Sequence, residues 1–122
     1  ALREGLRTIR GLRVPAIPSY AEHGWYKFYA FVEPGLLADG WDRYRVKETI
    51  SAEGVPCYSG SCPEIYLEKA FAEAGLGPEL PLPVARELGE TSLMFQAHPT
   101  LSSEDMRDMA GAVRVVLEKA TR

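Results

Sequence analysis

The alternation of apolar and polar residues is clearest near the C-terminal end of the chain. After Ser102, apolar side chains recur at intervals of three and four, the spacing of one buried helix face. The stripe consists of Met106, Met109, Ala110, Val113, Val116, Leu117 and Ala120. Asp105 stands three residues after Ser102, a pair typical of a capping box at a helix N-terminus. The pattern predicts a long amphipathic helix that packs on the core.

A different period marks residues 25–32, which are rich in aromatic and β-branched side chains and predict a strand. Alternation by two assigns to one side Tyr26, Phe28, Ala30 and Val32, and to the other Trp25, Lys27, Tyr29 and Phe31. Both sides are mostly apolar, whereas a sheet with one solvated side alternates apolar with polar residues. The composition therefore suits a strand that is buried on both sides. In so small a domain, however, we expect the layer that would cover one of the two sides to be missing.

Shorter signals predict the remaining elements. The first ten residues predict a short helix, followed by an extended loop because Gly11, Pro15 and Pro18 interrupt the helical spacing. A second helix is predicted from Asp39 or Asp42 to about residue 53. Gly54 should end it by adopting the left-handed backbone conformation common after helix C-termini. Residues 55–58 predict a short strand that lies at an edge of the sheet or begins at Pro56, because proline cannot donate to the ladder.

In the second half of the chain, Pro63 predicts the start of a helix that ends before Gly75. Residues 75–83 should be irregular, residues 83–88 should form a short helix that ends at Gly89, and residues 92–96 should form a third strand. The chain should therefore be one α+β domain over residues 1–122, with helices packed on a sheet of about three strands.

Composition narrows the possible functions. The net charge is −3 and the basic residues are dispersed, which argues against a nucleic-acid partner. The apolar run of residues 28–32 is far shorter than the roughly 20 residues that a membrane-spanning helix needs, so we expect no membrane partner. Two cysteines do not form a disulfide scaffold, and a cytoplasmic location is the expectation. The chain begins without Met, which favours a fragment of a longer protein.

Several side chains could carry chemistry, but none in a specific pattern. Zinc could in principle be held by His23, Cys57, Cys62 and His98, although the cysteine spacing is wider than in structural zinc sites, and we assign no metal site. The serines at 59 and 61 lack a nucleophile-elbow pattern and fit a polar turn better. Lys27 either reaches an anion at a domain interface or extends past the sheet edge. His98, in a loop after a strand, is either a site residue or structural.

Three stretches together resemble a known family. They are residues 23–29 (HGWYKFY), 52–58 (AEGVPCY), and 82–89 (LPVARELG) leading to 98–102 (HPTLS). In this order and at these separations they resemble the C-terminal small domain of the DegT/DnrJ/StrS family of pyridoxal-phosphate-dependent sugar aminotransferases. The resemblance implies a mainly antiparallel sheet with helices packed on one face. It also implies that residues 1–20 are a helix and loop connecting to a large domain not contained in this chain.

The family reaction moves an amino group, typically from glutamate, to a keto-sugar nucleotide. The resemblance implies that the large domain holds pyridoxal phosphate on a lysine. No lysine here lies in that sequence context, so no catalytic or cofactor-binding residue is assigned and the fragment alone should be inactive. The predicted substrate-binding residues are Lys27, Tyr58, Ser59, Gly60 and Ser61. Relatives often carry a His-Tyr pair where this chain has Gly60 and Ser61, which leaves the sugar unidentified.

The resemblance further implies a homodimer and a role in amino-sugar supply for surface polysaccharide. It also explains the two-sided strand, because the large domain could cover its second side. Two other function classes stay open from the residues alone. One is a stand-alone α+β module that binds a metabolite or a protein without chemistry, and the other is a thiol or zinc domain.

Overall fold

The computed structural model describes residues 1–60 and 62–122. Within them the chain builds a four-stranded sheet in which every neighbouring pair is antiparallel. The strands are β1 (Leu12–Arg13), β2 (Lys27–Val32), β3 (Cys57–Tyr58) and β4 (Ser92–Gln96), arranged in the order β1-β2-β4-β3. The predicted α+β class and antiparallel sheet are confirmed.

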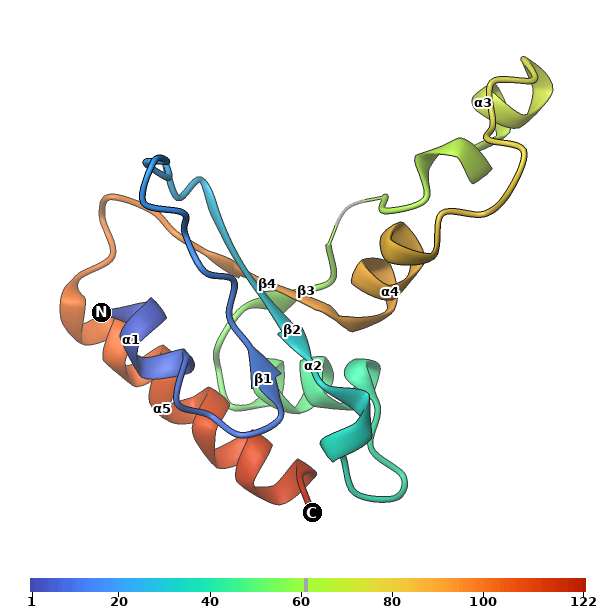
Figure 1. Ribbon diagram of the computed structural model, residues 1–122. Coiled ribbons are helices and arrows are strands. Elements are labelled where there is room, and N and C mark those ends of the chain that lie inside the picture. Colours follow the sequence, from blue (N-terminus) through green and yellow to red (C-terminus); the bar gives the residue numbers. More distant parts are fainter. Residues whose placement is uncertain (61) are drawn as a thin grey trace.

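Three helices cover one side of this sheet (Figure 1): α1 (Leu2–Leu6), α2 (Arg43–Ala52) and α5 (Ser103–Ala120). Between them and the sheet lies the core, whose largest fully buried side chains are Phe95, Leu6, Ile50, Leu93, Leu117, Val46, Val113 and Val116. Figure 1 shows α1 lying along α5, and Leu2 and Leu6 of α1 are buried in the same core. The N-terminal helix is therefore an integral part of this layer.

Capping side chains and a glycine determine where α2 and α5 begin or end. Asp105 N donates to Ser102 Oγ at 3.1 Å and Ser102 N donates to Asp105 Oδ2 at 2.7 Å, which confirms the capping box of α5. Asp42 caps α2 by accepting a hydrogen bond from Arg45 N at 2.7 Å. After α2, Gly54 has a φ of 86°, the left-handed conformation that glycine adopts without strain.

The structure corrects several sequence-based expectations in and beside the sheet. The sheet has four described strands rather than about three, because β1 is only two residues long and gives no periodic signal. β2 begins at Lys27 rather than at Trp25. Trp25 has a φ of 46°, which breaks the alternation, and Tyr26 is consequently 83% exposed instead of lying on the side of Phe28.

Residues 62–82 leave the body of the domain as a protrusion, which we call the arm (Figure 1). The single helix predicted from Pro63 is wrong: the arm contains a 3-10 turn, Ile65–Leu67, and a short α3 (Lys69–Glu73). The chain returns through α4 (Pro83–Thr91), which continues through Gly89 instead of ending there. Gly89 is needed for a different reason, since a Cβ at this position would collide with the ring of Pro63 at the base of the arm.

Candidate functional site

The side of the sheet opposite the helices presents the polar and aromatic residues of the predicted site. Antiparallel register places Tyr29 beside Met94 and Met94 beside Tyr58, while Lys27 pairs with Gln96 at the end of β4. On the other side, the row formed by Phe28, Phe95 and Cys57 is buried under the helices. We call the first side the open face, because the three helices α1, α2 and α5 all lie on the other side.

A hollow of about 710 Å³ lies at the end of the open face. It is lined by Gly24, Trp25, Tyr26, Lys27, Tyr58, Met94, Gln96, Ala97, His98 and Pro99. Ligand sites in proteins occupy about 300–1,000 Å³ and combine aromatic walls with a few polar groups, which is the composition found here. Among the predicted substrate-binding residues, the structure brings Lys27 and Tyr58 into this one hollow.

The other predicted residues lie beside the hollow. Gly60 N donates to Ser92 Oγ at 3.1 Å, and a Cβ on Gly60 would lie 2.8 Å from that oxygen and 3.4 Å from Tyr29 Cε1. Glycine thus lets the turn after β3 lie directly on the open face. Ser59 is exposed. Ser61 lies outside the described residues.

Trp25 lines the hollow from a backbone conformation that a bulky side chain rarely adopts. Its φ of 46° is the only positive value at a non-glycine residue in the described chain. The indole stacks on Phe28 with ring centroids 5.0 Å apart, and Trp25 N donates to His23 Nδ1 at 2.9 Å. Such strained residues concentrate at ligand sites, where the surrounding structure holds them in place.

His98, in the loop after β4, also lines the hollow, and contacts with Thr100 orient its ring. Thr100 N donates to His98 Nδ1 at 3.3 Å, and Thr100 Oγ1 lies 2.8 Å from the same nitrogen. A backbone N–H can only donate, so Nδ1 is the acceptor in the contact with Thr100 N, whereas the contact with Thr100 Oγ1 fits either ring tautomer. His98 lines the hollow, and its contacts with Thr100 order the loop that follows β4, so both interpretations that the sequence left open for it remain open.

Sequence reasoning did not assign Trp25, Met94, Gln96 and His98 to the site. Met94 and Gln96 could have been found, because alternation along β4 places both on the side of Tyr58 and Lys27 once the strand pairing is known. Trp25 could not, since its left-handed backbone has no signal in the sequence.

The two cysteines have separate environments. Cys57 is buried under the helices, and burial raises the pKa of its thiol to about 12, which leaves it protonated and unreactive at neutral pH. Cys62 is exposed, and its Sγ donates to Glu68 Oε1 at 2.9 Å. Within residues 1–60 and 62–122, no three His, Cys, Asp or Glu side chains are grouped as metal ligands.

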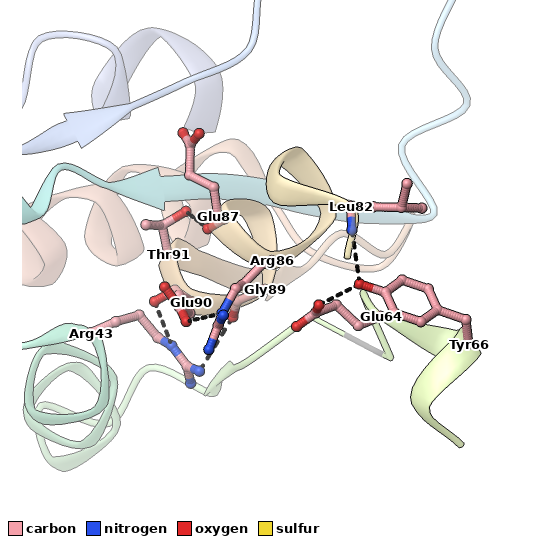
Figure 2. A network of polar contacts seen from close by, with 9 residues as sticks. All are labelled: Arg43, Glu64, Tyr66, Leu82, Arg86, Glu87, Gly89, Glu90 and Thr91. Atoms are coloured by element: carbon pink, nitrogen blue, oxygen red, sulfur yellow. Dashed lines mark hydrogen bonds and ion pairs between the residues drawn. The ribbon is translucent and has the colours of Figure 1, made fainter. Parts of the chain in front are cut away.

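A network of polar contacts fixes the base of the arm against the body (Figure 2). Arg43 of α2 donates to the carbonyl oxygens of Gly89 and Glu90 at the end of α4, both at 3.4 Å. Tyr66 Oη donates to Glu64 Oε1 at 2.5 Å and accepts from Leu82 N at 3.1 Å, so it joins the outgoing and returning ends of the arm. These bonds set the position of α4, which leads directly into β4 and the hollow.

Comparison with solved structures gives the decisive observation. The aminotransferase from Psychrobacter cryohalolentis is 38% identical, with a TM-score of 0.85 over 97% of this chain and 33% of its own. A DegT DnrJ EryC1 StrS aminotransferase from Brucella abortus has 24% identity and a TM-score of 0.73, covering 93% of this chain and 28% of its own. The resemblance to DegT/DnrJ/EryC1/StrS aminotransferases is confirmed.

The PLP-form of a putative sugar aminotransferase, Spr1654 from Streptococcus pneumoniae, shares the fold at 17% identity and a TM-score of 0.74, covering 97% of this chain and 29% of its own. The chain spans about a third of the length of these solved relatives. Comparisons with protein-family models and with curated protein sequences found no match. No helix of the described residues has the length and apolar content needed to cross a bilayer.

The described residues do not fit pyridoxal phosphate as a Schiff-base site. Such a site needs a lysine and a charged partner for the pyridine nitrogen. Lys27 is the only amine in the hollow, and no Asp, Glu or Arg is among its lining residues. Lys47 is paired with Glu48 at 2.7 Å, outside the hollow. This hollow therefore lacks the groups that a pyridoxal-phosphate Schiff base needs.

Proposed function

We propose that this chain is the C-terminal small domain of a pyridoxal-phosphate-dependent aminotransferase that transfers an amino group from glutamate to a keto-sugar nucleotide. The observation that carries the proposal is the 38% identity and 0.85 TM-score to an aminotransferase over 97% of the chain. The cofactor and its lysine would belong to a large domain beyond these residues, and the isolated chain would be inactive. The product would serve amino-sugar and surface-polysaccharide synthesis in the cytoplasm.

In this proposal the open face is the substrate side of the small domain. Lys27 would neutralise an anionic group of the substrate, Tyr58 would contact the sugar, and the turn of Ser59, Gly60 and Ser61 would line the same cleft. The open face supports this arrangement, because Lys27, Tyr29 and Phe31 are only half-buried although they belong to β2, the longest of the described strands. A large domain of the same polypeptide, or of its partner in a homodimer, would complete the cover.

A chimera tests the proposal. The matching segment of the Psychrobacter cryohalolentis aminotransferase is replaced by this chain, and 2-oxoglutarate formation is followed with glutamate and a panel of keto-sugar nucleotides. We expect amino transfer, with losses in Lys27→Met and Tyr58→Phe. Matched controls are Lys69→Met on the arm and Tyr20→Phe, whose side chain is 90% exposed and outside the hollow. A chimera that folds and binds the cofactor but does not transfer would contradict the proposal.

A second experiment uses the 122-residue chain itself. The chain is mixed with pyridoxal phosphate, reduced with borohydride and mapped by peptide analysis. We expect no stoichiometric adduct, because the hollow offers Lys27 but no partner for the pyridine nitrogen. A single stoichiometric adduct on one lysine would show that this chain contains more of the catalytic site than the proposal allows.

A further inference from the structure

Trp25 stands where three cavities meet. Residues 14–23, which we call the strap, connect β1 towards β2 and enclose a cavity of about 170 Å³ against β2. Trp25 lines this cavity, the hollow of the open face, and a third cavity of about 410 Å³ beside α1. No other described residue lines all three. The indole is therefore a wall that the hollow shares with the spaces behind it.

Trp25 keeps this position in an unfavourable backbone conformation. Its φ of 46° lies in the left-handed region, which a bulky residue seldom occupies. The indole stacks on Phe28, which is itself fixed in the core at 3% exposure. Trp25 N donates to His23 Nδ1 at 2.9 Å, and the two rings lie with their centroids 4.3 Å apart. Of these contacts, the hydrogen bond to His23 acts on the strained backbone directly.

This hydrogen bond depends on the protonation state of the His23 ring. A backbone N–H can only donate, so Nδ1 must carry a free electron pair. Protonation puts a hydrogen on both ring nitrogens and turns Nδ1 into a second donor that faces Trp25 N. Histidine side chains ordinarily change charge between about pH 5 and pH 8. His23 is exposed, so its ring exchanges protons directly with solvent.

Other ionisable groups lie around the two rings and have to be separated from His23 by experiment. Those that line the three cavities are the Ala1 amino group, Arg3, Glu4, Glu22, Tyr26, Lys27, Tyr29, Tyr58 and His98. Arg3 and Glu4 lie 4.0 Å apart as an ion pair. The Ala1 amino group and His98 belong to the classes that titrate in the same range as His23.

We propose that His23 is a positioning residue that acts as a pH-sensitive latch on Trp25. When the ring is neutral, Nδ1 holds Trp25 in the left-handed conformation, and the indole stays on Phe28 as a wall of the hollow. When the ring is protonated, it no longer accepts the bond, Trp25 returns to an extended backbone, and the wall opens towards the strap. The inference goes beyond the proposed function, because it concerns the shape of the hollow whatever the hollow binds.

Asparagine at position 23 supplies the decisive variant. Its side-chain oxygen accepts from the backbone N–H two residues on, as His23 does here, and it does not titrate. His23→Asn should therefore hold Trp25 in place at both ends of the pH range, whereas His23→Ala should release it at both. His98→Asn is the matched control, since it replaces the chain's other histidine and should leave the pH response intact.

The measurement is NMR on the isotope-labelled 122-residue chain. An intraresidue NOE between HN and Hα is strong when φ is positive, because the two hydrogens are then close, and NOEs from the indole to the Phe28 ring report the side chain. The ¹⁵N shifts of the His23 ring follow its protonation in the same sample. We expect both sets of Trp25 NOEs to weaken as His23 protonates, with the left-handed population falling by about tenfold. Unchanged signals of α5 would show that the domain stays folded.

Four results would overturn the inference. The first is a strong HN–Hα NOE of Trp25 that persists after His23 is protonated, and the second is a His23 ring that stays neutral down to about pH 5. The third is a pH response of Trp25 that survives in His23→Asn or disappears in His98→Asn. The fourth is a His23→Ala chain in which Trp25 keeps its left-handed conformation at alkaline pH.

Discussion

Two stretches rich in apolar residues have opposite environments in this chain. In α5, Val113, Val116 and Leu117 are fully buried against the sheet. In the arm, Leu67, Leu76 and Leu80 are 66%, 68% and 76% exposed. Periodicity explains the difference, because α5 concentrates its apolar residues on one face, whereas the arm has a 3-10 turn and one short helix that bury no side chain. Apolar content alone therefore does not identify the core.

The largest effect should come from a matched pair of phenylalanines. Phe95 of β4 is fully buried, and Phe95→Ala should lower the free energy of unfolding by about 3–5 kcal/mol through lost burial and the cavity left behind. Phe71 of the arm is 37% exposed, and Phe71→Ala should cost less than about 1 kcal/mol. Urea denaturation of both variants measures the difference, and equal losses would show that the arm shares the core's cooperativity.

Two glycines give the next contrast. Gly89→Ala places a Cβ against the ring of Pro63 and should destabilise the chain by about 1–3 kcal/mol, since α4 or Pro63 must move to relieve the collision. Gly111 lies within α5 with open space around its missing side chain, so Gly111→Ala should stabilise by about 0.5–1 kcal/mol. Thermal unfolding of both variants gives the sign of each change. Stabilisation by Gly89→Ala would mean that α4 can move away from Pro63.

A smaller effect concerns the N-terminus of α5 and depends on pH. Hydrogen bonds from the Ser102 side chain and backbone N–H hold the pKa of Asp105 below its ordinary value. A lowered carboxyl pKa contributes stability that is present above the unfolded pKa and is lost as the pH falls through the folded value. Asp105→Asn should therefore lower the Tm more at neutral pH than at strongly acidic pH. A difference in Tm that is independent of pH would contradict this origin.

The sequence predicted those parts of the fold that depend on local chemistry. The stripe of α5, its capping box, the bounds of β4 and the cap of α2, which the sequence left between Asp39 and Asp42, all follow from residues close in the chain. The missed parts depend on distant contacts. The two-residue β1 exists only through its pairing with β2, and the surroundings of Gly89 in α4 are made by Arg43 and Pro63, which are 46 and 26 positions away in the chain. The same holds for the site, where register across the sheet, rather than any motif, brings Lys27, Tyr58 and Gln96 together.

The smallest effect on stability should come from an exposed leucine of the arm, and it separates folding from function most sharply. Leu80→Ser removes an apolar side chain that is 76% exposed, so the free energy of unfolding should change by less than about 0.5 kcal/mol. Exposed apolar groups in one protrusion favour contact with another surface. In the chimera, the same substitution should therefore weaken the assembly of the small domain with the rest of the enzyme, measured as a lower Tm of the chimera but not of the 122-residue chain. If the isolated chain loses as much stability as the chimera, the arm's leucines belong to this domain's own core, and the contrast between arm and α5 no longer holds.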